Sequence, residues 1–556
     1  MSLTQNLHQG LCLRLILIVA IVVGVDVLRP AISAAAAPVI STSKGAIAGV
    51  QSASMNEYLG VPYATPPVGQ LRWTPSQSNR SWKGVLQATQ FGNKCPQFDF
   101  TIGKIIDNED CLYLNVFTPR NQGQNGQGRN EGENLPVMVW IHGGAYTSGS
   151  GDPYDPTRLV DKGVIVVTIN YRIGLFGFFA HPAIDAEGHL NGNYGLMDQQ
   201  MALKWVKQNI GAFGGDPARV TIFGQSAGGH SVYAHLASPL SKGLFQRAIA
   251  ESGAYVQFQD YFGFVMPLAA AETTGLLPLL PSGILEASLV NCGGDSSAAT
   301  AACLRAVPAS SFVNIAPSTL FAIIDGTLLT QSPTAAIGSG QFNRVSVMTG
   351  SNHDEYRSFI ADEYDFQGNP LSNSAYQAAL QAIFGTTLGD SLFFNVYPLP
   401  SSPPANAAAL ALSTALTDDL FACPERNSVK LLSRFVKTYA YEFNDENAPP
   451  TQDFFGGSLT FPLGAYHTAE LQFLFIGEFF GFPVLPLSAD EQALSDAMVS
   501  YWTRFGKTGN PNSRSTPLWA PYNSSTDQFQ SLIPPTPSVE STFDKEHLCS
   551  AFWNTF

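Results

Sequence analysis

A glycine-flanked serine between an apolar run and a helix-compatible segment constrains the fold of this 556-residue chain more than any other feature. Residues 219–223 (RVTIF) lead into the GQSAG motif of residues 224–228, and residues 228–237 (GGHSVYAHLA) follow. Flanking glycines allow a tight strand-to-helix turn without Cβ clashes. Such a turn exposes the Ser226 hydroxyl at a helix N-terminus, where amide dipoles favour an anion. The segment predicts a nucleophilic serine, and the alternative is a capping serine at a glycine-rich helix start.

Other apolar runs place this turn in a sheet. Residues 135–141 (LPVMVWI), 163–170 (GVIVVTIN) and 344–350 (RVSVMTG) are rich in β-branched residues. The first two runs lack alternation, which indicates burial on both faces. Residues 193–210 carry apolar residues at helical spacing. Strands alternating with helices predict an α/β fold, with a large, mostly parallel central sheet flanked by helices.

The loop after the first run supplies small residues next to a strand end. The sequence there is His142-Gly143-Gly144-Ala145. Acyl transfer needs backbone N–H groups that point at a developing oxyanion, and small residues let a substrate approach the backbone. We expect the N–H groups of Gly144, Ala145 and Ala227 to form an oxyanion hole. The alternative is an ordinary turn after a strand.

A serine nucleophile needs a general base. Beyond the helix expected after the serine motif, histidines occur only at positions 353, 467 and 547. His467 lies in a loop-like stretch before an apolar run. His353 immediately precedes the candidate acids, and His547 lies two residues from Cys549, where a structural role is expected. His230 and His235, on the helix itself, are also expected to be structural.

The acid that orients the base is expected after the run of residues 344–350. Asp354 and Glu355 both follow that run, in a loop where an orienting carboxylate belongs. The alternative for either is a solvated surface charge. Reasoning from the residues leaves the choice between them open.

The first 37 residues are predicted to be a cleaved export signal. Arg14 precedes an apolar run at residues 15–25, which is shorter than the ~20 residues that span a bilayer. Alanines at 34–37 offer cleavage sites, and a retained signal anchor is the alternative. Residues 38–556 are expected to form a single, secreted domain, although length alone would allow three or four domains of ~150 residues.

Export to an oxidising compartment would allow the cysteines to form disulfides. Six remain after the signal, and an even number in an exported chain indicates disulfides, with fifteen possible connectivities. The natural pairing by short loops is Cys95–Cys111 and Cys292–Cys303, which leaves Cys423–Cys549. Sequons predict glycosylation at Asn79 and Asn523.

Charge and motif spacing exclude some classes of partner. The net charge is 29 − 43 = −14, and no block of Lys or Arg occurs, so the chain is not expected to bind nucleic acid. No Cys/His spacing typical of a metal site is present. Neither a metal nor an organic cofactor is expected.

Longer stretches resemble the type-B carboxylesterases, which include cholinesterases and fungal esterases and lipases. Residues 109–116 (EDCLYLNV) and 223–229 (FGQSAGG) look like the two signatures of that family, and the resemblance runs from about residue 39 to 556. It implies an α/β-hydrolase fold with Ser226 as nucleophile, Glu355 as acid and His467 as base. It also supports the proposed oxyanion hole and the three disulfide pairings.

Three positions depart from the family pattern. Gln225 stands where the family commonly has Glu, and Tyr356 stands where Gly usually follows the acid. The loop between Cys95 and Cys111 encloses fifteen residues and has no Trp. Cation–π recognition needs such an aromatic face, so neither a choline site nor a long lid is expected there.

The sequence therefore predicts a secreted serine esterase that hydrolyses neutral, small-molecule carboxylic esters through an acyl-enzyme. One alternative is a triacylglycerol or sterol-ester lipase that acts at a lipid interface. The other is a catalytically inactive adhesion or binding protein on the same fold. The pattern does not specify acyl-chain length, alcohol preference or oligomeric state.

Overall fold

The computed structural model describes residues 35–99, 101–120, 134–254, 265–274, 282–315, 322–450, 458–479, 482–483 and 485–555. All but the last three residues of the predicted export signal therefore lie outside the described residues. In the described part, a central sheet has 12 strands, in the spatial order β1 (Ala35–Ala36), β4 (Val50–Gln51), β5 (Met55–Pro62), β9 (Tyr113–Pro119), β11 (Ile165–Ile169), β10 (Leu135–Ile141), β12 (Gly215–Gln225), β13 (Arg247–Glu251), β14 (Ser346–Asn352), β15 (Thr438–Phe443), β18 (Phe529–Leu532) and β19 (Ser538–Glu540).

The centre of this sheet is parallel and its edges are antiparallel. The strands from β11 to β18 pair in parallel, whereas β1, β4, β5 and β9 at one edge and β19 at the other pair antiparallel. The predicted mostly parallel α/β sheet is confirmed. The predicted runs form β10, β11, β12 and β14, and the short outer strands were not predicted.

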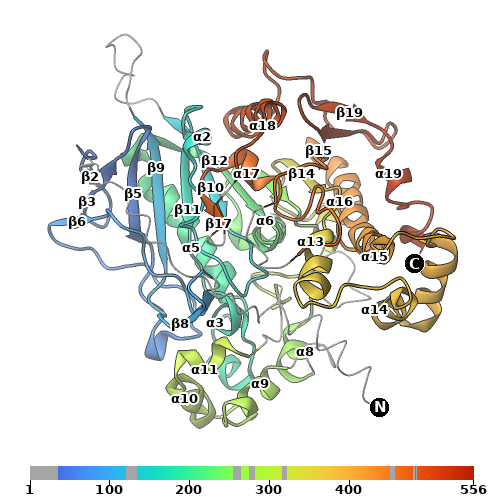
Figure 1. Ribbon diagram of the computed structural model, residues 1–556. Helices are drawn as coiled ribbons and strands as arrows, with labels where there is room; N and C mark the ends of the chain where they lie inside the picture. Colours follow the sequence, from blue (N-terminus) through green and yellow to red (C-terminus); the bar gives the residue numbers. More distant parts are fainter. Residues whose placement is uncertain are drawn as a thin grey trace.

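Strand β10 shows why the central runs lack alternation. Met138 and Trp140 pack in the core cluster that contains α18 (Ala489–Thr508). The alternate residues Val137, Val139 and Ile141 pack in a second cluster with α5 (Tyr194–Asn209) and α6 (Ala227–Ala237). The sheet is therefore covered by helices on both faces (Figure 1), and apolar side chains are required on both sides of its central strands.

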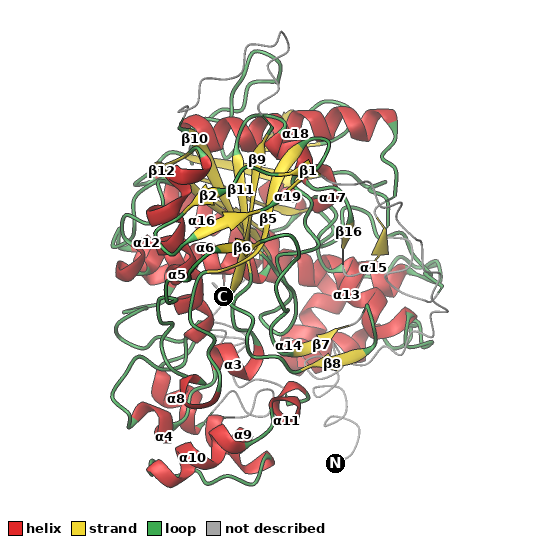
Figure 2. Ribbon diagram, turned by 90° about the vertical axis from the view of Figure 1, so that its left-hand side faces the viewer, coloured by secondary structure: helices red, strands yellow, loops and turns green. Residues whose placement is uncertain are grey.

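Further helices surround these layers. In chain order they are α2 (Thr157–Val160), α3 (Gly174–Phe178), α4 (Pro182–Asp185), α8 (Leu268–Thr273), α9 (Gly283–Leu289), α10 (Ala298–Ala306), α11 (Ala309–Val313), α12 (Pro333–Gly338), α13 (Arg357–Ile360), α14 (Tyr376–Ser391), α15 (Ala407–Thr417), α16 (Cys423–Ser433), α17 (Leu471–Leu474) and α19 (Phe543–Glu546). Figures 1 and 2 show α8–α11 gathered at one end of the molecule, below the sheet in both views. None of the helices that the structure describes combines the length and the apolar composition needed to cross a bilayer.

Among the described residues, three small sheets lie outside the central one: β2 (Ile40–Ser41) with β3 (Ala46–Ala48) and β6 (Val85–Gln87), β7 (Gln97–Asp99) with β8 (Lys104–Ile106), and β16 (Glu478–Phe479) with β17 (Phe482–Pro483). The pair β7–β8 forms the short loop closed by Cys95–Cys111. The disulfides Cys292–Cys303 and Cys423–Cys549 are also present, so all three predicted pairings are confirmed. The last of them ties the segment after α19 to the start of α16.

Candidate active site

Parallel strand pairing brings the predicted site loops to one edge of the sheet. Ile141 at the end of β10 pairs with Gly224 near the end of β12, so the two loops that follow begin side by side. Strand β14, two positions further along the sheet, ends at Asn352. Ligand sites in such sheets lie outside the carboxyl ends of the strands, and the candidate nucleophile, oxyanion hole and acid all start there.

The Ser226 turn has the strained geometry that the motif predicts. Its φ is +55° and its ψ is −124°, in a region that residues other than glycine rarely adopt. A Cβ on Gly228 would lie 1.9 Å from the carbonyl oxygen of Ile141, and one on Gly224 would lie 2.6 Å from the same atom. Glycine is thus required on both sides of Ser226, because β10 and the turn approach closely.

The loop after β10 lies against this turn. A Cβ on Gly143 would come within 3.2 Å of the Ser226 Cβ. Gly144 and Ala145 have φ values of +99° and +52°. Within the described residues, the backbone N–H groups of Gly144, Ala145 and Ala227 donate to no protein acceptor. These three donors are therefore free to bind a substrate oxygen, as an oxyanion hole requires.

A buried histidine holds the same loop in place. The His142 ring stacks on Tyr171 with 4.3 Å between the ring centroids, and His142 Nδ1 donates to the Gly143 carbonyl at 2.8 Å. The Tyr171 hydroxyl donates to the His142 carbonyl at 2.7 Å. Burial lowers the pKa of His142 to about 4, so its ring is neutral near pH 7. Sequence reasoning missed this support, because nothing in the motif indicates where the His142 ring points.

Glu355, and not its neighbour Asp354, contacts His467. Glu355 Oε2 lies 2.5 Å from His467 Nδ1, and Glu355 Oε1 accepts the Asn352 N–H at 2.8 Å. The Asp354 carboxylate instead pairs with Arg357 at 2.7 Å. Glu355 is fully buried, so the imidazole is oriented by a carboxylate shielded from water. The geometry therefore distinguishes between the two carboxylates that sequence reasoning left open.

The remaining histidines lie in other surroundings. His353 and His547 both contact Glu442 and are described below. His230 and His235 are buried in α6, and burial lowers the pKa of each to about 3. Both rings are therefore neutral near pH 7, and they pack in the protein interior.

Comparison with known proteins agrees with this geometry. The family model described as the carboxylesterase family matches residues 36–552. The chain belongs to the carboxylesterase family. It is accordingly a carboxylic ester hydrolase with an α/β-hydrolase fold.

Relatives of this carboxylesterase match over nearly their whole length. Cocaine esterase of Homo sapiens is 33% identical over 520 residues, which cover 88% of this chain and 85% of the relative. Para-nitrobenzyl esterase of Bacillus subtilis is 33% identical over 499 residues, covering 88% of this chain and 93% of the relative. A solved structure of PNB esterase superposes with a TM-score of 0.71 at 30% identity, covering 92% of this chain and 99% of that one.

Gln225, a departure from the common family pattern, lies beside His467, the candidate base. Gln225 Nε2 is 3.3 Å from His467 Nε2. With the Nδ1 proton held by Glu355, His467 Nε2 carries a lone pair, so the Gln225 amide can donate to it. This contact places His467 Nε2 next to the residue that immediately precedes Ser226. The carboxylesterase thus has a neutral amide here instead of a carboxylate.

Two aromatic rings flank the same imidazole. The Phe359 and Phe421 ring centroids lie 5.1 and 5.3 Å from that of His467. Phe359 follows Glu355 on α13, and Phe421 lies between α15 and α16. The His467 ring is consequently bordered by apolar surface.

Further acidic side chains are buried near the acid. Asn352 Nδ2 donates to Glu470 Oε2 at 2.5 Å, and Thr349 Oγ1 donates to Glu425 Oε1 at 2.6 Å. Burial raises the pKa of Glu470 to about 7 and that of Glu425 to about 8, with the charge of Glu355 adding to both shifts. Protonation of these groups near neutral pH limits the negative charge that accumulates around Glu355.

The short Cys95–Cys111 loop is hydrogen-bonded to the loop that follows β10. Gln97 Nε2 donates to the Gly149 carbonyl at 2.9 Å, and the Gly149 N–H donates back to Gln97 Oε1 at 2.8 Å. This reciprocal pair connects β7 to the loop that follows β10. The sequence prediction identified the short loop but not its attachment.

Proposed function

We propose that this carboxylesterase is a secreted serine esterase in which Ser226 is the nucleophile, His467 the base and Glu355 the acid. The observation that carries the proposal is the position of the His467 ring. Its Nδ1 faces Glu355 Oε2 at 2.5 Å, and its Nε2 faces the residue next to Ser226. A base whose one nitrogen is held by a carboxylate, and whose other nitrogen contacts the residue before a strained serine, is positioned to activate that hydroxyl.

The proposed reaction proceeds in two halves. Ser226 Oγ attacks the ester carbonyl while His467 Nε2 accepts its proton, and Glu355 stabilises the imidazolium that forms. The N–H groups of Gly144, Ala145 and Ala227 stabilise the tetrahedral oxyanion. The alcohol leaves with the proton from His467. Water, deprotonated by the same nitrogen, then attacks the acyl-enzyme and releases the carboxylic acid product from Ser226.

Neutral, small esters are the proposed substrates. The Gln225 amide and the rings of Phe359 and Phe421 place three uncharged groups next to His467. The relatives include proteins named cocaine esterase, acylcarnitine hydrolase and para-nitrobenzyl esterase. These names cover several small-molecule esters, which supports a substrate of that size.

Export is proposed from the sequence and supported by the cysteine pairing. Three disulfides are expected of a protein that folds in an oxidising compartment. Asn523 is exposed, in a turn where it can accept a glycan, and Asn79 is half-buried. Cleavage of the signal and glycosylation at Asn79 and Asn523 are part of the same proposal.

Initial rates on p-nitrophenyl esters of increasing acyl length, with and without emulsified triglyceride, test this function. An esterase of this kind hydrolyses the dissolved short-chain esters, with no increase in rate when an interface is present. A rate increase at the emulsion would instead identify a lipase. No turnover of any ester, together with no labelling by an organophosphate, would identify an inactive binding protein.

A further inference from the structure

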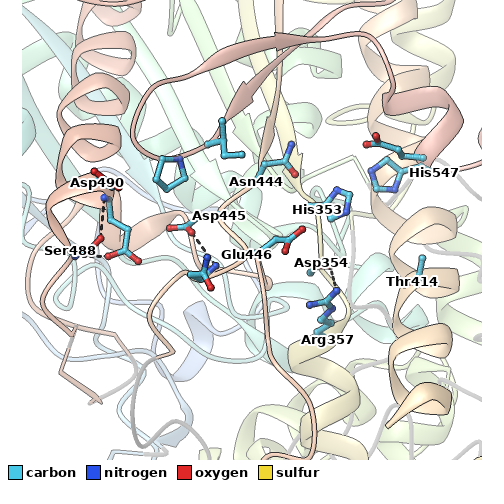
Figure 3. Close-up of a pocket in the computed structure, with 15 residues that line it drawn as sticks. His353, Asp354, Arg357, Thr414, Asn444, Asp445, Glu446, Ser488, Asp490 and His547 are labelled. Atoms are coloured by element: carbon cyan, nitrogen blue, oxygen red, sulfur yellow. Dashed lines mark hydrogen bonds and ion pairs between the residues drawn. The ribbon is translucent and has the colours of Figure 1, made fainter. Parts of the chain in front are cut away.

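A cavity lies beside the candidate active site, next to Asp354 and His353. Its volume is about 830 Å³, and it is bordered by residues that follow β14, β15 and α19. Figure 3 shows His353 and His547 at one end of this cavity, with Ser488 and Asp490 at the other. Neither Ser226 nor His467 lines it. The cavity is therefore lined by other side chains than the candidate nucleophile and base.

Two imidazoles converge here on one carboxylate oxygen. Glu442 Oε1 lies 2.6 Å from His547 Nε2 and 3.0 Å from His353 Nδ1. The two rings lie 5.2 Å apart between centroids. One ligand atom from each of the three side chains falls within 4.8 Å of the others. Only a small movement of these side chains would bring the three ligand atoms to about 2.0–2.2 Å from one ion placed between them.

An outer layer of groups fixes these side chains. Asp418 Oδ1 lies 2.5 Å from His547 Nδ1, the ring nitrogen that points away from Glu442. Asn444 Nδ2 donates to Glu442 Oε2 at 3.0 Å. Metal-binding histidines usually donate their second N–H to a carboxylate, which selects the tautomer and orients the ring. Asp418 is in the position to do this for His547.

We propose that His353, Glu442 and His547 bind a divalent transition-metal ion of the Zn²⁺ class. Two imidazoles and a carboxylate suit zinc in ligand type, and water from the cavity completes the coordination. The side chain of His353 is 30% exposed, whereas those of Glu442 and His547 are buried, so the ion enters past His353. On binding, an imidazolium releases the proton of its ligating nitrogen to solvent, whereas a neutral imidazole binds through its unprotonated nitrogen with its proton on the other nitrogen, and Glu442 stays ionised.

The His547 ring lies between two carboxylates, Glu442 and Asp418. Burial alone would lower the pKa of His547, but Glu442 and Asp418 outweigh it and raise that pKa well above its usual value. Burial and the adjacent Glu442 also raise the pKa of Glu540. Because a nitrogen that binds a metal must be unprotonated, the affinity for the metal falls as the pH is lowered.

Metal binding to the purified, tag-free enzyme tests the proposal. Equilibrium dialysis with Zn²⁺ and the visible absorption of Co²⁺ at pH 7.5 should show one saturable site. His353→Ala should weaken binding at least about tenfold. His189→Ala is the matched control: its side chain is 23% exposed and also pairs with a glutamate, Glu187, yet it lies outside the cluster. That variant should bind like the wild type.

Two further readouts distinguish a built site from adventitious binding. Affinity for Zn²⁺ should fall about tenfold per pH unit for every proton displaced. Zn²⁺ at 100 times its dissociation constant should raise the Tm by roughly 3 °C in the wild type and not in His353→Ala. Ser226→Ala should bind Zn²⁺ normally, because the site is independent of the proposed esterase mechanism. Absence of saturable binding, or equal binding by wild type and His353→Ala, would overturn the proposal.

Discussion

Glu355 and His467 lie 112 residues apart in the chain, yet Oε2 of the first is 2.5 Å from Nδ1 of the second. The contact depends on the end of β14 at Asn352. The backbone N–H of Asn352 donates to Oε1, the other carboxylate oxygen of Glu355. The same loop directs Asp354 towards Arg357 instead. Adjacent carboxylates thus have different partners, and this difference can be tested directly.

Replacing each carboxylate by its amide should separate the two roles. Glu355→Gln should lower kcat about 10³–10⁴-fold with little change in KM, because the amide no longer stabilises the imidazolium. Asp354→Asn removes the ion pair with Arg357, while its amide oxygen can still accept the Ala465 N–H, so it should keep kcat within about threefold. Steady-state kinetics on p-nitrophenyl butyrate measure both. A larger loss in Asp354→Asn than in Glu355→Gln would reverse the assignment.

A methyl group on Gly228 should disrupt the serine turn. Its Cβ would lie 1.9 Å from the Ile141 carbonyl oxygen, so Gly228→Ala should lose about 3 kcal/mol or more of stability, together with activity. Gly211→Ala is the control, since its Cβ would meet nothing within 4 Å. Thermal unfolding by circular dichroism, with ester turnover, compares the two. Full activity in Gly228→Ala would rule out the close approach.

Glu425 should make the enzyme less stable at alkaline pH. Burial raises its pKa from 4.5 to about 8. The proton that the folded state retains stabilises it fully below pH 4.5, and this contribution is lost as the pH rises through 8. Glu425→Gln should therefore gain stability relative to wild type, by up to about 1.4 kcal/mol per pH unit across that interval.

Urea unfolding from pH 5 to pH 9 measures this difference. The exposed substitution Asp107→Asn should follow the wild-type profile and serves as the control. Parallel profiles for wild type and Glu425→Gln would show that Glu425 does not retain its proton in the folded enzyme.

The disulfides should differ in their contribution to stability. Cys423–Cys549 closes a loop of 126 residues, and Cys292–Cys303 closes one of 11. Loop-closure entropy gives about 5 kcal/mol for the first and about 3 kcal/mol for the second. Paired Cys→Ser variants, compared by denaturant unfolding, should show the larger loss for the long loop. The reverse order would mean that loop length does not govern their effect.

Much of the sheet could be predicted from the sequence because its central strands carry a strong local signal. Residues 135–141 are apolar at every position, and both faces of β10 are indeed covered by helices. The outer strands are short and pair antiparallel, so neither length nor periodicity identifies them. The short helices of four or five residues are likewise too short for their periodicity to identify them.

The site could be predicted only in part. The serine motif and the glycine loop are contiguous in sequence, whereas the choice between Asp354 and Glu355 depends on how one loop turns. The cluster of His353, Glu442 and His547 joins three segments that are 89 and 105 residues apart in the chain, and no spacing rule connects them. Such contacts follow from strand pairing, which local sequence does not encode.

Pre-steady-state hydrolysis of p-nitrophenyl acetate tests the central claim, that Ser226 forms an acyl-enzyme, most directly. Wild-type enzyme should release about one equivalent of p-nitrophenol in a burst, and an organophosphate should abolish the burst and label the peptide containing Ser226. Ser226→Ala should fold like the wild type and show neither burst nor label. A burst or steady hydrolysis of wild-type size in Ser226→Ala would contradict the account.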